Sequence, residues 1–462
     1  MPNPRLICWT KIVTATVLAA GFSSIASEAA PRPDADLQAG KTAYGQYCAR
    51  CHGETGKGDG VDARRFYPRP RDLSMGKYKF RSTATGTTPS DEDLFHTITY
   101  GLPGSNMPDW QHLDEATRWQ LVEYLKSLST AFTDNPPQPV VLPADPGRAK
   151  TDLAKGRQVY EQLGCAACHG SHGRANGPSA AGLVDEWNMP IRPANLTQGW
   201  AYRGGHAAKD IATRVLTGID GANMPSYDGA ITPPEDVWQL AYYVESLQEP
   251  SNWNMIAHAQ AIEVSLPQTP DDPRWKQAEL TTLRLRNAVT PEGEWAHPPT
   301  VRMVSLRAVF NEEAVAFRIE WDDPSHDPES PADSAALLLR PAGVPGDVVT
   351  LQAWPHAGSP RLDICAWSSN NEQEAAESLA GDFEPLAASA SRPPALKSSA
   401  KYEDGRWTLV IQRPFKPASP EGASVLSTVN SNPIAFVIWD GANENARAVS
   451  PWVDLVLQKP KR

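Results

Sequence analysis

The sequence predicts two small all-α domains followed by an antiparallel β-sandwich. Three observations lead to this prediction. The pattern C-x-x-C-H occurs twice, as "CARCH" from Cys48 and as "CAACH" from Cys165. Around both copies the apolar residues recur at helical spacing, whereas after about residue 275 they alternate as in β-strands. At 462 residues the chain is long enough for two to three domains.

Residues 1–29 are predicted to be an export signal. Arg5 and Lys11 precede the apolar run "IVTATVLAAGF", which the small residues of "SSIASEAA" follow. We expect cleavage after Ala26 or Ala29 and therefore a periplasmic protein. The apolar run of 11 residues is too short to span a bilayer, and no later stretch is longer, so stable membrane insertion is not expected.

The chain is acidic. Its formal net charge is −11, and removing Arg5 and Lys11 with the signal would make it −13, or −12 if Glu28 is also removed. A surface of this sign repels phosphates, so nucleic acid and anionic lipid are not expected as partners.

Four of the six cysteines lie in the two C-x-x-C-H patterns: Cys48, Cys51, Cys165 and Cys168. This pattern is typical of c-type haem attachment, in which both thiols bond to the porphyrin and the histidine ligates the iron. A redox dithiol does not need the histidine, and a zinc site would need a second ligand pair nearby. The patterns therefore predict two covalent c haems with His52 and His169 as iron ligands. Cys365 is expected to be a small buried residue.

Residues 36–131 and 152–249 are predicted to be two copies of one domain. The offset is 117 residues for three pairs of positions: Cys48 and Cys165, Asp93 and Asp210, and Met107 and Met224. The Pro-rich segment 132–151 between the copies is expected to be a semi-rigid linker.

Each copy is predicted to be helical. Apolar residues at i, i+3, i+4 and i+7 mark a closing helix in both copies: Leu121, Tyr124, Leu125 and Leu128, then Leu240, Tyr243, Val244 and Leu247. An earlier helix in each copy should end at Gly101 or Gly218, because glycine tolerates the left-handed backbone of a helix end.

Met107 and Met224 are predicted to be the second axial iron ligands. Each lies 55 residues after the histidine of its copy, in the sequence Asn-Met-Pro. Met75 and Met189 have no matching partners and are expected to be packing residues. Histidine and methionine together fill both axial positions, so such a haem transfers electrons and has no open site for a substrate. A di-haem peroxidase would need an open site, and the two matched loops argue against it.

On these motifs the two copies resemble class I mono-haem cytochrome c domains in tandem. The resemblance covers about 200 residues.

The second half of the chain is predicted to be a β-sandwich over residues 280–458, after a linker over 250–279. In "AVAFRIEW" every second residue is large and apolar. Further short runs have the same character: "RLDICAW", "RWTLVIQRPF", "PIAFVIWDG" and "PWVDLVLQ". Strands without intervening helices indicate an antiparallel sandwich. The segment 371–400 is expected to be a long loop or short helices.

The segments "VAFRIEWDDPSHDPESPADSAALLL", "YEDGRWTLVIQRPF" and "AFVIWDGANENARAVSPWVDLVL" resemble the haem-binding domain of ethylbenzene dehydrogenase-type γ subunits. These belong to molybdenum enzymes of the dimethyl sulfoxide reductase family. The resemblance implies a b haem and a relay between the iron–sulfur and molybdenum subunits and a soluble cytochrome or other redox protein. The chain is then expected to be a non-catalytic electron-transfer subunit or electron partner of a molybdenum oxidoreductase.

The b-haem ligands depart from the pattern of that family, which uses a methionine and a lysine. The turn "WPHAGSPRLDICAW" contains no methionine, and His356 stands near its place. Lys401 or Lys397 would supply the amine, which ligates only when it is neutral and therefore desolvated. The sequence leaves open whether a b haem is bound.

A second interpretation is a dihaem cytochrome c fused to a non-haem, ligand- or carbohydrate-binding sandwich. It would use exposed aromatic residues, and this half contains eight tryptophans: Trp275, Trp295, Trp321, Trp354, Trp367, Trp407, Trp439 and Trp452. Most of them fall in strand patterns and are better explained as core.

Overall fold

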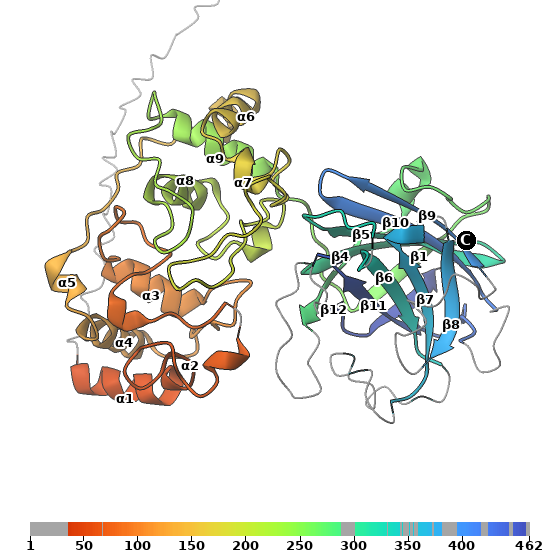
Figure 1. Ribbon diagram of the computed structural model, residues 1–462, viewed down its shortest axis with the longest axis horizontal. Helices are drawn as coiled ribbons and strands as arrows, with labels where there is room; N and C mark the ends of the chain where they lie inside the picture. The colour runs from red at the N-terminus through yellow and green to blue at the C-terminus, as the bar shows by residue number, and fades with distance from the viewer. Residues whose placement is uncertain are drawn as a thin grey trace, which may run out of the picture.

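The computed structural model comprises two helical units and a β-domain (Figure 1). It describes residues 36–66, 68–287, 301–329, 331–341, 344, 351, 354, 359–371, 374–380, 395–416, 424–442 and 447–458. The expected export signal and His356 lie outside the described residues. No helix in the described part of the chain is long and apolar enough to cross a bilayer.

The first helical unit is built on the crossing of two helices, α1 and α4. Gly40 lies at this crossing, where a Cβ atom would overlap the backbone carbonyl of Gln120. The hydroxyl of buried Tyr44 donates to the carbonyl of Gly53 at 2.7 Å. The helices of this unit are α1 (Leu37–Tyr47), α2 (Ala49–His52), α3 (Asp91–Tyr100), α4 (Glu115–Ser127) and α5 (Ala131–Asp134).

The second helical unit repeats this arrangement, as the 117-residue offset predicts. A Cβ atom on Gly156 would overlap the carbonyl of Gln239, and the hydroxyl of Tyr160 donates to the carbonyl of Gly170 at 2.7 Å. Its helices are α6 (Leu153–Gln162), α7 (Ala166–His169), α8 (Ala208–Thr217) and α9 (Asp236–Ser246).

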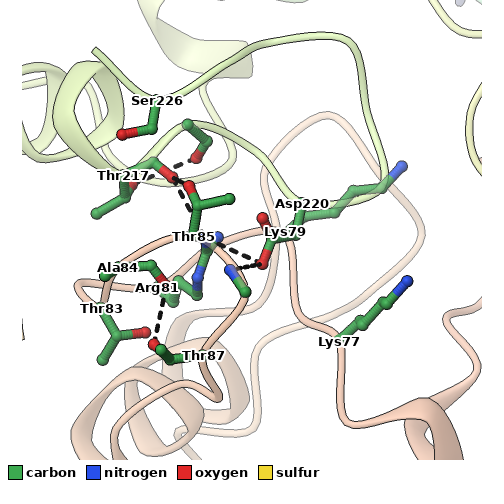
Figure 2. A network of polar contacts seen from close by, with 12 residues as sticks. Lys77, Lys79, Arg81, Thr83, Ala84, Thr85, Thr87, Thr217, Asp220 and Ser226 are labelled. Atoms are coloured by element: carbon green, nitrogen blue, oxygen red, sulfur yellow. Dashed lines mark hydrogen bonds and ion pairs between the residues drawn. The ribbon is translucent and has the colours of Figure 1, made fainter. Parts of the chain in front are cut away.

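The two helical units are docked against each other through a buried polar network (Figure 2). Arg81 of the first unit is only 2% exposed and forms an ion pair with Asp220 of the second at 3.0 Å. The hydroxyl of Thr85 donates to the carbonyl of Thr217 at 2.8 Å. From the second unit to the first, the guanidinium of Arg214 donates to the carbonyl of Lys79 at 3.1 Å. Direct contact therefore sets the distance between the units.

The Pro-rich linker lies along both units. The carbonyl of Gln138 accepts a hydrogen bond from the amide of Ala84 at 2.8 Å in the first unit. The carbonyl of Pro143 accepts from the indole of Trp238 at 2.9 Å in the second. These contacts make the linker part of the docked structure.

The prediction of a β-sandwich is wrong, because the strands close into a ten-stranded barrel. The ring runs β13-β1-β4-β5-β10-β9-β8-β7-β6-β11 and is closed by pairing of β11 with β13. Neighbouring strands are antiparallel, except that β1 is parallel to both β13 and β4. Closure pairs every strand edge in the ring. The ring strands are β1 (Ile256–Ala261), β4 (Met303–Phe310), β5 (Ala314–Asp322), β6 (Ser334–Leu339), β7 (Leu362–Ser368), β8 (Glu374–Ala380), β9 (Ala395–Glu403), β10 (Arg406–Pro414), β11 (Asn432–Trp439) and β13 (Val453–Gln458).

Three ring strands lie wholly or partly where the sequence predicts none. β1 falls in the expected linker 250–279, and β8 and most of β9 fall in the segment 371–400 that was expected to be a loop or short helices. β1 and β8 are rich in Ala, Gln, Glu or Ser and lack the large alternating residues that mark a strand. Three short strands pair outside the ring: β2 (Thr281–Arg284), β3 (Arg286–Asn287) and β12 (Arg447–Val449).

The barrel core has the aromatic content that the alternation predicts. One face of β5 is fully buried in the core: Val315, Phe317, Ile319 and Trp321. The rings of Trp321, Trp367 and Trp407 pack together with centroids 5.0–6.3 Å apart. Cys365 is also buried, as expected. These tryptophans therefore stabilise the barrel.

The barrel is fastened to the second helical unit by the carboxylate of Asp322, the last residue of β5. It accepts hydrogen bonds from the side chains of Asn195 at 2.7 Å and Gln198 at 3.1 Å. Arg406, on β10, donates to Asp322 at 2.7 Å and to Glu249 at 2.8 Å. One buried carboxylate thus joins two domains.

Candidate functional site

Each C-x-x-C-H pattern forms a single helical turn. α2 begins after Cys48, and the amide of His52 donates to the carbonyl of Cys48 at 2.9 Å. Residues three apart on a helix lie on the same face, so the turn presents the thiols of Cys48 and Cys51 together. α7 repeats this geometry after Cys165, and all four thiols are free.

The histidine of each turn is oriented by a backbone carbonyl. Nδ1 of His52 lies 3.0 Å from the carbonyl oxygen of Arg71, and Nδ1 of His169 lies 2.9 Å from that of Ala194. A hydrogen on Nδ1 leaves the lone pair of Nε2 for a metal. Burial lowers the pKa of both histidines, which favours the neutral, ligating imidazole. These carbonyls lie in loops of different length, so self-comparison of the sequence does not reveal them.

The thiols are not suited to dithiol redox chemistry. Burial raises the pKa of Cys48 to about 12 and that of Cys165 to about 11. A redox-active cysteine has a lowered pKa and reacts as the thiolate. The first cysteine of each turn therefore lacks the lowered pKa that a redox dithiol requires.

A cavity of about 1400 Å³ brings the predicted residues of the first copy together. Cys48, Cys51 and His52 line it with Met107, which reaches it from the loop after α3. Its wall includes apolar and aromatic side chains from the core of the unit: Tyr47, Tyr78, Leu94, Ile98, Trp110, Leu121 and Leu125. Thiols, imidazole, thioether and an apolar wall in one cavity fit a covalently attached haem.

The two methionine loops have the same backbone conformation. The amide of Leu102 donates to the carbonyl of Met107 at 3.1 Å, and the amide of Ile219 donates to that of Met224 at 3.0 Å. Gly101 and Gly218 end the preceding helices with φ of +65° and +62° and ψ of −163° and −164°. This positive-φ conformation suits glycine, but it is not the left-handed helical cap that the sequence predicted. Met224 and Cys165 both pack against the core cluster of their unit. The repeat therefore extends to the loops that carry the predicted axial ligands.

The second unit contributes to the first cavity. Trp187 and Met189, both from the loop before α8, line it. Met189 of the second unit thus lines the site of the first unit. No repeated spacing in the sequence indicates this position.

Arg71 connects the two units at this cavity. Its carbonyl holds His52, while its guanidinium donates to Glu186 at 3.0 Å and to the carbonyl of Asp220 at 3.2 Å. The guanidinium also lies over the ring of Trp187, 4.3 Å from its centroid. The orientation of the first histidine is therefore tied to the second unit.

Although the chain is acidic, many basic residues line this cavity: Arg50, Lys57, Arg64, Arg69, Arg71, Lys79, Arg174, Arg192, Arg203 and Arg302. Positive charge around the cavity suits the carboxylates of haem.

The lysines expected for a b haem are not in a desolvated site. The ammonium of Lys401 forms ion pairs with Asp271 at 3.1 Å and Glu403 at 2.9 Å, and its side chain is 39% exposed. Hydrogen bonds to these carboxylates raise the pKa of Lys401, which keeps the amine protonated. Lys397 is exposed. Neither meets the condition for binding iron as a neutral amine.

Comparison with known proteins agrees with the repeat. Residues 35–125 match the family described as cytochrome C oxidase, cbb3-type, subunit III, and residues 153–248 match the cytochrome c family. Both helical units are cytochrome c domains. Domains of this family carry c haem, and they are typically found outside the cytoplasm.

Relatives with known names are components of redox complexes. A Haloferax mediterranei protein that carries the provisional name respiratory nitrate reductase heme subunit ORF7 is 25% identical over 40% of this chain and 67% of its own length. The cbb3-type cytochrome c oxidase subunit CcoP of Azospirillum sp. (strain B510) is 29% identical over 46% of this chain, which spans 62% of that relative. A chain of the Kuenenia stuttgartiensis reducing HAO-like protein complex is 40% identical, with 48% of this chain and 100% of that chain covered and a TM-score of 0.44.

Proposed function

We propose that this protein is a two-haem electron-transfer protein that relays electrons between two redox partners. The observation that carries the proposal is the cavity in which Cys48, Cys51, His52 and Met107 meet. The second domain repeats these residue types as Cys165, Cys168, His169 and Met224.

Each domain would hold its haem in the same way. The two cysteines would bond covalently to the porphyrin, and His52 with Met107, or His169 with Met224, would ligate the iron. When bound with both axial positions filled, the haem supplies one-electron transfer, and thioether ligation raises its reduction potential. The chain orients the imidazoles through the carbonyls of Arg71 and Ala194 and lines the first site with apolar residues.

Electrons would pass between the two domains across their docked face. The ion pair of Arg81 with Asp220 and the contacts of Arg71 hold the second domain against the first site. These contacts would fix the separation of the two sites, which a flexible tether would leave variable.

We infer that the partners are subunits of a periplasmic molybdenum oxidoreductase on one side and a soluble cytochrome or other redox protein on the other. Support for this comes from the γ-subunit motifs in residues 280–458 and from relatives that are named as subunits of respiratory complexes. The proposal rests on two c haems, because the described lysines of the barrel do not suit a b haem.

The test is to count the haems of the purified full chain by intact mass and by the pyridine haemochrome spectrum. We expect two covalent haems in the wild type. The Cys51→Ala variant should keep the haem that is bonded to Cys165 and Cys168. Cys365→Ala, the matched control, should retain both haems because Cys365 lies in the barrel core. A wild-type protein with one covalent haem or none would refute the proposal.

A further inference from the structure

Three buried carboxylates meet at one end of the barrel. Asp323 and Asp333 lie at the two ends of the loop between β5 and β6, and Asp440 follows β11. Asp323 and Asp333 are 0% exposed and Asp440 is 3% exposed. One oxygen from each lies within 4.8 Å of the other two.

One oxygen of Asp323 has no hydrogen-bond partner among the described residues. Oδ1 of Asp323 accepts from the amide and hydroxyl of Ser325, whereas no described group donates to its buried Oδ2. Within the part of the chain that the structure describes, no lysine or arginine pairs with Asp323 or Asp333. A buried carboxylate without a partner is strongly destabilising, so such an oxygen needs a proton or a cation.

Another acidic cluster in the barrel has a cationic side chain beside it. Asp363 and Glu377 lie near Cys365, but the guanidinium of Arg413 pairs with Asp363 at 2.8 Å and with Glu377 at 2.9 Å. This guanidinium offsets one of the two carboxylates, although Oδ1 of Asp363 and Oε2 of Glu377 also have no hydrogen-bond partner among the described residues. Asp323 and Asp333 differ from this pair because no lysine or arginine of the described residues forms an ion pair with either of them.

We propose that Asp323, Asp333 and Asp440 form a binding site for a calcium ion. Calcium takes oxygen ligands at about 2.3–2.6 Å, which places ligands on opposite sides of the ion about 4.6–5.2 Å apart. Oxygens that all lie within 4.8 Å of one another fit around such an ion. Magnesium binds at about 2.0–2.1 Å in a strict octahedron and usually retains several waters, which suits a buried three-carboxylate cluster less well.

The surrounding hydrogen bonds hold the carboxylates in place. Asp333 accepts from the amide of Gly441 at 2.9 Å with one oxygen, and from the amide of Asp327 at 2.9 Å and the indole of Trp407 at 3.1 Å with the other. Asp440 accepts from the amide of Ala442 at 3.0 Å. Donors that orient a ligand raise the affinity of a metal site.

The site lies beside the contact between the barrel and the second cytochrome c domain. Asp322, which accepts from Asn195 and Gln198 of that domain, directly precedes Asp323. The amide of Asp323 donates to the carbonyl of Gly405, and the hydroxyl of Tyr402 donates to the carbonyl of Asp323 at 3.0 Å. A calcium ion would therefore fix the loop on which Asp322 is mounted and strengthen docking of the second domain. This inference goes beyond the proposed function.

The experiment uses the full haem-loaded chain, stripped with EGTA and transferred to chelator-free buffer. Isothermal titration with calcium chloride should show one ion per chain, and thermal unfolding should shift to higher temperature when calcium is added. Asp323→Asn and Asp440→Asn should each bind calcium about 10–100-fold more weakly. Asp454→Asn, an exposed position on β13, is the matched control and should bind as the wild type does.

Wild-type protein that binds no calcium, or binds magnesium more tightly than calcium, would overturn the proposal without reference to any variant. So would an Asp323→Asn protein that unfolds at a higher temperature than the calcium-loaded wild type, because this would show that a proton satisfies Asp323. The haem count of each sample separates this outcome from failure of the cytochrome c domains.

Discussion

At the scale of single residues, the two methionines predicted as axial ligands would set the potentials of the proposed electron relay. Met107 reaches the first cavity from a loop that follows a glycine with positive φ. Met224 lies in the equivalent loop of the second domain, which also follows a glycine with positive φ. Nitrogen favours ferric iron relative to a thioether, so ligand exchange should alter the potential and leave covalent attachment unchanged.

Met107→His should lower the reduction potential of one of the two haems by on the order of 100 mV or more, within the roughly 0.8 V range that axial ligands span. A spectroscopic redox titration measures both potentials. Met75→Leu, at an exposed position, is the control and should change neither. If Met107→His leaves both potentials as in the wild type, the ligand of the first iron is another residue.

The ionisation of Asp323 should make stability depend on pH. Burial and the nearby carboxylates of Asp440, Asp333 and Asp327 raise the pKa of Asp323 well above its usual value, and Tyr402 also faces this group. The folded state then binds the proton more tightly than the unfolded state, whose pKa is about 3.9. Without calcium, the free energy of unfolding should therefore fall as pH rises from about 4 through the raised pKa.

Thermal unfolding in EGTA across this pH range measures the effect. Saturating calcium should reduce the decline, because the ion stabilises the ionised form. Asp323→Asn should also reduce it in EGTA, since the amide does not titrate. The raised pKa values of Asp333 and Glu377 should leave a smaller decline. A decline of equal size in Asp323→Asn would assign the pH dependence to other groups.

At the scale of elements, close helix crossings define each cytochrome c domain. α1 approaches α4 at Gly40, and α6 approaches α9 at Gly156, with no room for a Cβ atom at either position. A glycine followed four residues later by a tyrosine is visible in the sequence of both copies. The carbonyl groups that these glycines face, those of Gln120 and Gln239, cannot be identified from the sequence.

Gly40→Ala should destabilise the first domain by about 1–3 kcal/mol, because the methyl group forces α1 away from α4. Gly45→Ala is the matched control on the same helix, where a Cβ atom would meet nothing within 4 Å. It should be neutral or stabilise the helix by up to about 1 kcal/mol. Denaturant unfolding followed by the haem absorbance compares the two, and equal effects would contradict the role of the crossing.

At the scale of the whole molecule, buried charges fasten the three domains together. Arg81 reaches across to Asp220 between the cytochrome c domains, and Asp322 joins the second of these domains to the barrel. Removing one partner of either contact leaves the other partner's charge unpaired in a buried interface. Such an unpaired charge lowers the free energy of unfolding much more than the loss of an exposed ion pair does.

Arg81→Ala should destabilise the docked pair by about 3–5 kcal/mol, since Asp220 loses its partner. We expect the two cytochrome c domains to unfold at separate temperatures in calorimetry, whereas the wild type unfolds them together. Arg157→Ala removes an exposed pair with Glu161 on α6 and should cost less than about 1 kcal/mol. A single, unshifted transition in Arg81→Ala would show that other contacts hold the domains.

The sequence by itself determined the repeated domain, its helices, the two C-x-x-C-H turns, the matched methionine loops and the strands with large alternating residues. Those features depend on residues near one another in the chain, or on a spacing that recurs. Only the tertiary structure decided the closure of the barrel, because β1 and β8 owe their place to pairing with distant strands and not to their own composition. The same holds for the carbonyl of Arg71 beside His52, the role of Asp322 and the meeting of Asp323, Asp333 and Asp440. Each is a contact between segments whose separation has no pattern, so only the folded backbone brings its members together.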